Sequence, residues 1–168
     1  MKLLITILLL PLFAIAQHKS DIAVYGTFGS KSSSPVFGNV NGNFNGLEVS
    51  YRENHGRFYN EFQVWNADLG RLYIGSDTTT RGFMGHEYGG AFGIGYNFIQ
   101  HNSFSVSVIP QVGFAIGNHI YSVGRGILRV NWRIVEMSIT DAYETTPFTI
   151  HGYLNRVYVG FGFRQKWL

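Results

Sequence analysis

The sequence of 168 residues has no cysteine, and only 14% of its residues are charged. Without cysteine there is no disulfide framework, no thiolate zinc site, no catalytic thiol and no acceptor for N-terminal lipidation. Charged residues normally make up about a quarter of a soluble domain. The net charge is +3 and no run of Lys and Arg occurs, so we expect no nucleic-acid partner.

Long apolar runs are also scarce, and the clear example lies at the N-terminus. A single charge, Lys2, precedes the apolar run Leu3 to Leu10, and Ala14-Ile15-Ala16 offers the small residues that a signal peptidase accepts. The run is shorter than the roughly 20 residues that span a bilayer, and a proline follows it, which argues against the alternative of an N-terminal membrane helix. We therefore expect residues 1–16 to be a cleavable signal peptide and Gln17 to begin an exported mature chain.

No segment after residue 17 keeps a helical period for three turns. Side chains alternate with period two instead, which is typical of strands. Residues 87–98, 103–114 and 157–164 show this most clearly. In each stretch one face is large, apolar and uncharged, whereas the other is mostly Gly, Ala and Ser.

This difference between the two faces separates two architectures. A soluble sheet would fill its second face with Lys, Glu, Thr and Gln for contact with water. A face of small residues suits the crowded interior of an outer-membrane barrel, whose exterior is apolar towards lipid. We therefore predict a transmembrane β-barrel, and a soluble periplasmic β-sheet binding protein is the alternative.

Five further stretches complete the strand count. They are residues 21–28, 46–52, 57–65, 119–123 and 127–139. Tight turns are expected at 53–56, 100–102 and 124–126, and long polar loops at 29–45, 66–85 and 140–155. Short turns at one end and long loops at the other match the periplasmic and extracellular ends of such barrels. The predicted fold class is all-β: an antiparallel up-and-down eight-stranded transmembrane β-barrel, in one domain of residues 17–168.

Three features carry a resemblance to a known group. They are the Ala14-Ile15-Ala16-Gln17 cleavage region, the alternation of glycine with aromatic residues, and the ending RVYVGFGFRQKWL at residues 156–168. The whole mature chain resembles small (eight-stranded) outer-membrane β-barrel proteins of the Bacteroidota type. Members usually end in an aromatic residue, whereas here Trp167 is followed by Leu168. The resemblance implies residence in the outer membrane of a Gram-negative bacterium, contact with outer-membrane lipid, and the barrel-assembly machinery as a partner during biogenesis.

Seven charged side chains point into the lumen in the predicted register. They are Glu48, Arg52, Glu61, Glu87, Arg129, Arg133 and Arg164. Side chains fill the interior of an eight-stranded barrel, and a charge kept from water needs a partner. We therefore interpret this polar cluster as ion pairs that fill the lumen, with an ion path or a polar catalytic pocket as the alternative.

Aromatic and polar residues of the long loops form a candidate recognition surface. Its members are Phe44, Tyr73, Arg81, Phe83, Tyr143 and Phe148. We expect a structural role or loop-mediated binding, with an extracellular or envelope protein as the partner. Solvated loops with a few packed rings are the alternative.

No residue set fixes a chemistry, and we expect neither a metal nor a cofactor. The six histidines show no ligand spacing such as His-x-His. His101-Asn102-Ser103 resembles the His-x-Ser pair of outer-membrane lipid A deacylases, but it falls in a predicted periplasmic turn, and position 115 is alanine where their acid would be sought. A serine nucleophile needs an oriented base, so a lipid-modifying enzyme stays an alternative, as does a pore.

Overall fold

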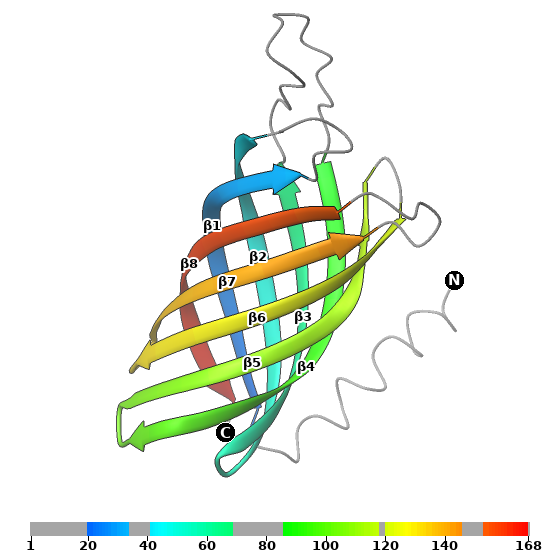
Figure 1. The fold of residues 1–168 in the computed structure, drawn as a ribbon. Helices are drawn as coiled ribbons and strands as arrows, with labels where there is room; N and C mark the ends of the chain where they lie inside the picture. The colour runs from blue at the N-terminus through cyan, green and yellow to red at the C-terminus, as the bar shows by residue number, and fades with distance from the viewer. Residues whose placement is uncertain (1–19, 34–40, 69–85, 118–119, 146–152, 168) are drawn as a thin grey trace, which may run out of the picture.

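The computed structural model describes residues 20–33, 41–68, 86–117, 120–145 and 153–167, which form one closed antiparallel barrel (Figure 1). Its strands are β1 (Ser20–Ser33), β2 (Asn41–His55), β3 (Phe58–Asp68), β4 (His86–His101), β5 (Phe104–Ile116), β6 (Ile120–Trp132), β7 (Val135–Thr145) and β8 (Tyr153–Trp167). The predicted fold class is confirmed. The expected signal peptide lies outside the described residues. In the described ranges no helix is long and apolar enough to span a membrane.

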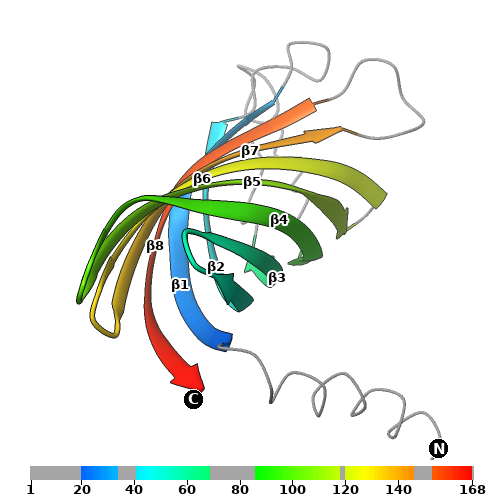
Figure 2. The same cartoon turned by 90° about the horizontal axis from the view of Figure 1, so that it is seen from below.

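Each strand pairs with its neighbours in the sequence, and the first strand pairs with the last. Val24 of β1 lies opposite Val49 of β2 on one side and Phe163 of β8 on the other. The start of β1 and the end of β8 lie at the same end of the barrel as the turns after β2, β4 and β6 (Figures 1 and 2). We call this the turn end and the opposite end the outer end.

Three two-residue turns lie at the turn end, and each contains one residue with a positive φ. These residues are Gly56 (φ 71°), Asn102 (φ 34°) and Arg133 (φ 55°). Positive φ matches the twist of strands joined by two-residue turns. Glycine adopts it freely, and asparagine tolerates it better than other residues do. Each of the first two turns overlaps its predicted segment at one residue, Gly56 or Asn102, because β2 and β4 run further than expected.

The predicted boundaries of the sixth and seventh strands are wrong. Residues 124–126, predicted as a turn, lie inside β6. Trp132 and Val135 pair across a turn that breaks the strand predicted at residues 127–139. Because this turn changes the parity of the strand, the inward positions of β7 carry even numbers rather than odd ones.

Strands continue into segments predicted as loops. β2 begins at Asn41 and β7 runs to Thr145, so the predicted loop residues Phe44 and Tyr143 lie in strands. The reason is backbone pairing, because Phe44 lies opposite Gly29 of β1, and Tyr143 lies opposite Gly124 of β6. In both strands the backbone pairing continues into residues that do not alternate between apolar and polar. The sequence pattern therefore did not predict a strand there.

The exterior of the barrel is apolar on every strand. Phe28, Phe62, Val112, Ile139 and Phe163 are between 46% and 72% exposed, and they belong to five different strands. Each square ångström of apolar surface left in water costs about 25 cal/mol. Such an exterior favours lipid over water as its surroundings, as the alternation in the sequence predicted.

Candidate functional site

The lumen is the site that this barrel builds from its inward-facing side chains. Among the described residues it holds six acidic and six basic side chains, all but one of them at least nine-tenths buried. The acids are Asp21, Glu48, Glu61, Glu87, Glu136 and Glu144, and the bases are Lys31, Arg52, Arg125, Arg129, Arg156 and Arg164. Their formal charges therefore cancel.

The centre of the lumen is a group that joins β1, β2, β3, β6 and β7. Arg52 donates two hydrogen bonds to Glu136, from Nη1 at 2.7 Å and from Nη2 at 2.6 Å, and one to Glu61 Oε2 at 2.9 Å. Arg129 Nη2 donates to Glu61 Oε1 at 2.8 Å. The hydroxyl of Tyr25 accepts a bond from Arg52 and donates one to Glu136. Each charge thus finds an opposite charge in place of water.

Arg164 connects this central group to the turn end. Its Nε lies 3.3 Å from Glu136 Oε1, and its Nη1 lies 3.6 Å from Asp21 Oδ2. Asn54 donates to the same Asp21 oxygen at 3.1 Å. A polar cavity of about 520 Å³ lies here, lined by these three residues and by Tyr59 among others.

A second group lies on the other side of the central one, around Glu48. Arg125 Nη2 and the Tyr158 hydroxyl each donate to Glu48 Oε1 at 2.8 Å, and Gln63 donates to the other oxygen. The Arg125 guanidinium also lies 4.6 Å from the centroid of the Trp65 ring. Arg125 is therefore bound by a carboxylate and an aromatic face at once.

A third group lies nearest the outer end, around Arg156. Its Nη2 donates to Glu87 Oε1 at 2.8 Å, and it also pairs with Glu144. Trp65 Nε1 donates to the same oxygen of Glu87 at 2.8 Å. The ring of Phe44 lies 5.4 Å from the Arg156 guanidinium. This group ties β2, β3, β4, β7 and β8 together.

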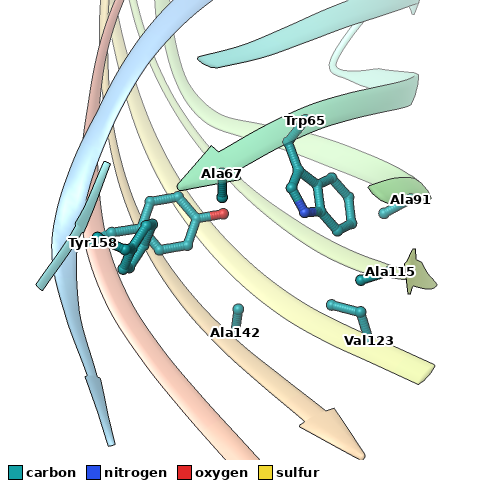
Figure 3. Close-up of a cluster of buried hydrophobic side chains, with 8 residues drawn as sticks. Trp65, Ala67, Ala91, Ala115, Val123, Ala142 and Tyr158 are labelled. Carbon is teal, nitrogen blue, oxygen red and sulfur yellow. The ribbon is translucent and has the colours of Figure 1, made fainter. Parts of the chain in front are cut away.

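An apolar cluster shares Phe44, Trp65 and Tyr158 with the second and third groups and so links them. Trp65 and Tyr158 project into it from opposite sides of the barrel, towards small side chains of the intervening strands (Figure 3). The other labelled members are Ala67, Ala91, Ala115, Val123 and Ala142. Small side chains opposite large rings let eight strands close around a filled interior.

The charged side chains fill the interior and bind one another across strands, so few of them are left accessible to a ligand. The carboxylates of Glu48, Glu61 and Glu136 each accept bonds or ion pairs from at least two different side chains. In the part of the chain that is described, no three acidic or histidine side chains are arranged to hold a metal ion. The geometry supports cohesion between strands as the chemical role of the lumen.

The structure brings most of the predicted lumen residues together and moves one away. Glu48, Arg52, Glu61, Glu87, Arg129 and Arg164 all enter the ion pairs described above. Arg133 does not, because it occupies the turn between β6 and β7 and is exposed. The turn was unrecognised in the sequence, so its residue was assigned an inward position.

The predicted recognition residues are placed differently from the expectation. Phe44 is 6% exposed and packs edge-to-face on Tyr158 inside the lumen, so it belongs to the interior. Tyr143 is 48% exposed and faces outward from β7. The other four, Tyr73, Arg81, Phe83 and Phe148, lie outside the described residues.

Sequence reasoning missed several lumen residues. They are Asp21, Tyr25, Lys31, Arg125, Glu136, Glu144 and Arg156. Arg125 was missed because residues 124–126 were predicted as a turn. Glu136 was assigned to the outward face because the turn before it was not predicted. A local signal exists: Ile134 and Val135 are adjacent, apolar and both exposed, which breaks the alternation and marks a change of parity.

The His-x-Ser pair lies where the sequence placed it. His101 is the last residue of β4, and Ser103 belongs to the turn before β5, at the turn end. Both are exposed. Ala115 lies near the other end of β5, so these positions do not gather at one place along the barrel.

The sequence matches no protein-family model and no curated protein. Its fold is similar to Ail, the attachment invasion locus protein of Yersinia pestis, solved in complex with the heparin analogue sucrose octasulfate (TM-score 0.59, 10% identity, 88% of this chain and 99% of that chain). A second Ail structure gives a TM-score of 0.52 at 11% identity, with the same two coverages.

Neisserial surface protein A is similar as well, with a TM-score of 0.55 at 8% identity over 84% of this chain and 96% of that chain. At these identities the similarity concerns the fold alone. The fold is that of small eight-stranded barrels of the Gram-negative outer membrane.

Proposed function

We propose that this protein is an outer-membrane anchor whose lumen is a structural filling and whose outer end does the binding. The observation that carries this proposal is the pairing of charges throughout the interior, in a barrel with an apolar exterior. Arg52, Glu61, Arg129 and Glu136 are committed to one another and are at most 2% exposed. Recognition then falls to the segments that join strands at the outer end.

Two properties of the barrel support a binding role at that end. The connections of the turn end are two-residue turns, whereas residues 34–40, 69–85 and 146–152 join strands at the other end. Long extracellular loops on a rigid barrel are the usual place for recognition. The similar Ail structure contains a heparin analogue, so sulfated polysaccharide is a reasonable first probe beside envelope and extracellular proteins.

The membrane part of the proposal is tested by fractionation and by an unheated gel. We expect the protein to stay in the membrane during a carbonate wash and to change its mobility in SDS only after boiling, because a closed barrel resists the detergent at room temperature. A protein that washes off and shows no such shift would be a soluble sheet protein, and the proposal would fail.

The binding part is tested with cells that display the protein. Cells are allowed to settle on surfaces coated with heparin or with extracellular-matrix protein, and residues 69–85 are replaced by a Gly/Ser linker of the same length. We expect adhesion above that of empty cells, and its loss in the linker variant while the gel shift persists. A turn variant, Asn102→Gly, is the matched control. Equal adhesion by all displaying cells would contradict loop-mediated binding.

The finer assignments belong to this proposal. We infer that residues 1–16 are removed on export, which the intact mass of the mature protein tests by a start at Gln17. The Gly-aromatic alternation of β8, with Gly160 and Gly162 between apolar neighbours, supports a barrel of the Bacteroidota type. The barrel-assembly machinery is then the partner during biogenesis, so depleting it should lower the amount of folded protein.

A further inference from the structure

A groove on the exterior lies where β8 extends beyond the end of its pairing with β7. The pairing of β7 with β8 starts at Val135 opposite Phe163, whereas β8 stays paired with β1 as far as Trp167. The turn of Arg133 and Ile134 sits in this step. Arg164 fixes it there, because its backbone N donates to Ile134 O at 2.7 Å and its Nη2 donates to Arg133 O at 3.0 Å.

The groove has a volume of about 620 Å³ and two chemically different parts. Its apolar wall consists of Ile22, Val24, Ile134 and Phe163, and the last two are 62% and 69% exposed. Its polar part consists of Arg133, Arg164, Gln165 and Lys166. The apolar part lies on the lipid-facing surface. The basic part lies at the rim of the turn end, where Arg164 and Lys166 also line the cavity at the end of the lumen.

The basic residues of the groove differ in whether they form ion pairs. Arg164 is paired with Asp21 and Glu136. Arg133 and Lys166 are exposed, and within the described ranges neither pairs with an acidic side chain. Two cations beside an exposed apolar wall are complementary to a ligand that joins a negative group to a hydrocarbon chain.

The position of Arg133 adds to this picture. It holds a φ of 55° in a turn position that glycine and asparagine occupy in the two other turns of this end. A residue other than glycine or asparagine is strained in this left-handed conformation. The Arg133 guanidinium lies 6.0 Å from the centroid of the Trp132 ring, and that ring is 62% exposed at the same rim. Local backbone preference therefore does not explain an arginine at this position.

We propose that this groove binds one anionic phospholipid of the inner leaflet, with its phosphate on Arg133 and Lys166 and an acyl chain along Ile134 and Phe163. Guanidinium recognises phosphate with paired hydrogen bonds, and ammonium does so as a point charge. The rim of the turn end is the level of the periplasmic headgroups in a barrel of this type. A headgroup that is only anionic places no positive charge near Arg133 and Lys166. A choline headgroup would place its own positive charge beside these two cations. The proposal rests on the membrane placement of the proposed function.

The experiment compares two lipids on the intact mature protein. The barrel is refolded into nanodiscs that contain phosphatidylglycerol and phosphatidylcholine in equal amounts, released into the gas phase, and the retained lipids are identified by native mass spectrometry. We expect one retained phosphatidylglycerol, preferred over phosphatidylcholine, and a loss of roughly fivefold in that preference for each cation removed by Arg133→Gln or Lys166→Gln.

A matched control is Arg57→Gln, which removes an exposed cation from the first turn, away from the groove. The control should keep the preference, and all variants should keep the gel shift on boiling. Equal retention of the two lipids by the wild type, or an equal loss in the Arg57 variant, would overturn the proposal. Adhesion through the outer end is expected to be unchanged in the double groove variant, so failure of the lipid site is distinguishable from failure of the proposed function.

Discussion

At the scale of single residues, the lumen depends on charges that have been taken out of water. Removing one partner from a buried ion pair costs far more than the pair gains over an apolar replacement, because the remaining charge keeps its desolvation penalty. Glu136 is the most connected acid of the central group: it binds Arg52 through both oxygens, accepts from Tyr25 and pairs with Arg164. Its loss should therefore affect several strands at once.

We predict that Glu136→Gln lowers the free energy of unfolding by about 3–5 kcal/mol, because Arg52 and Arg164 lose a charged partner while buried. Urea unfolding of the refolded barrel, followed by tryptophan fluorescence, measures this. The control is Asp141→Asn, an exposed outward acid of the same strand, which should change stability by less than about 0.5 kcal/mol. Similar losses in both variants would mean that the ion pairs of the lumen contribute little.

At the scale of elements, the inward face of β4 is small because its neighbours place rings against it. A Cβ atom at Gly95 would lie 2.1 Å from Tyr59 Cζ, and one at Gly89 would lie 2.0 Å from Trp65 Cζ2. Both glycines stand directly opposite those aromatic residues in the β3–β4 register. The small face predicted from the sequence is thus the complement of aromatic side chains on the next strand.

We predict that Gly95→Ala destabilises the barrel by about 1–3 kcal/mol through overpacking against Tyr59. Gly90→Ala is the control on the same strand, because its Cβ would face outward with no atom closer than 3.8 Å. Urea midpoints of the two variants decide the comparison. The double variant Tyr59→Leu with Gly95→Ala should recover part of the loss, and no recovery would contradict a clash with this ring.

The β6–β7 turn is the second element with a consequence for stability. We predict that Arg133→Gly raises the free energy of unfolding by about 1 kcal/mol, because glycine adopts a φ of 55° without strain. The same change should lower the lipid preference of the groove by roughly fivefold, as Arg133→Gln does, because it removes one cation. Asn102→Gly should have a smaller effect, because asparagine already tolerates positive φ. A destabilised Arg133→Gly protein would show that the arginine side chain contributes more to the turn than its backbone costs.

At the scale of the whole molecule, closure and filling act together. Eight strands enclose an interior just wide enough for side chains, and the three polar groups around Glu136, Glu48 and Arg156 occupy successive positions along it. The formal charges of the described lumen residues cancel, so these residues carry no net charge that would favour one sign of ion.

We therefore predict that the wild-type protein shows no discrete conductance steps in planar bilayers. A triple variant, Glu48→Ala with Arg125→Ala and Tyr158→Ala, removes the charges and one ring of the second group. It should give a measurable leak if it folds, which the gel shift on boiling reports. Regular conductance steps in the wild type would contradict a filled lumen and favour a pore.

The alternation of residues was enough to predict the fold class and the apolar exterior of the barrel. Alternation with period two is a local property, so it assigned Phe92 to the lipid face and Ala91 to the lumen without any knowledge of the partner strand. The sequence also placed the first two turns to within a few residues, at segments that contain Gly56 and Asn102. The inward direction of six predicted charges followed from the same rule.

Which charges meet, and where the inward positions change from odd to even numbers, follows from the closed barrel and not from the local pattern. Arg52 and Glu136 are 84 residues apart, and their contact depends on closure of the barrel, which no local pattern encodes. The turn at Arg133 contains neither glycine nor asparagine, so the sequence pattern predicted one continuous strand there. In that strand Glu136 was assigned to the outward face, which is wrong. Faces are set by neighbours one or two residues away, whereas ion pairs in a closed barrel are set by strands that meet across its lumen.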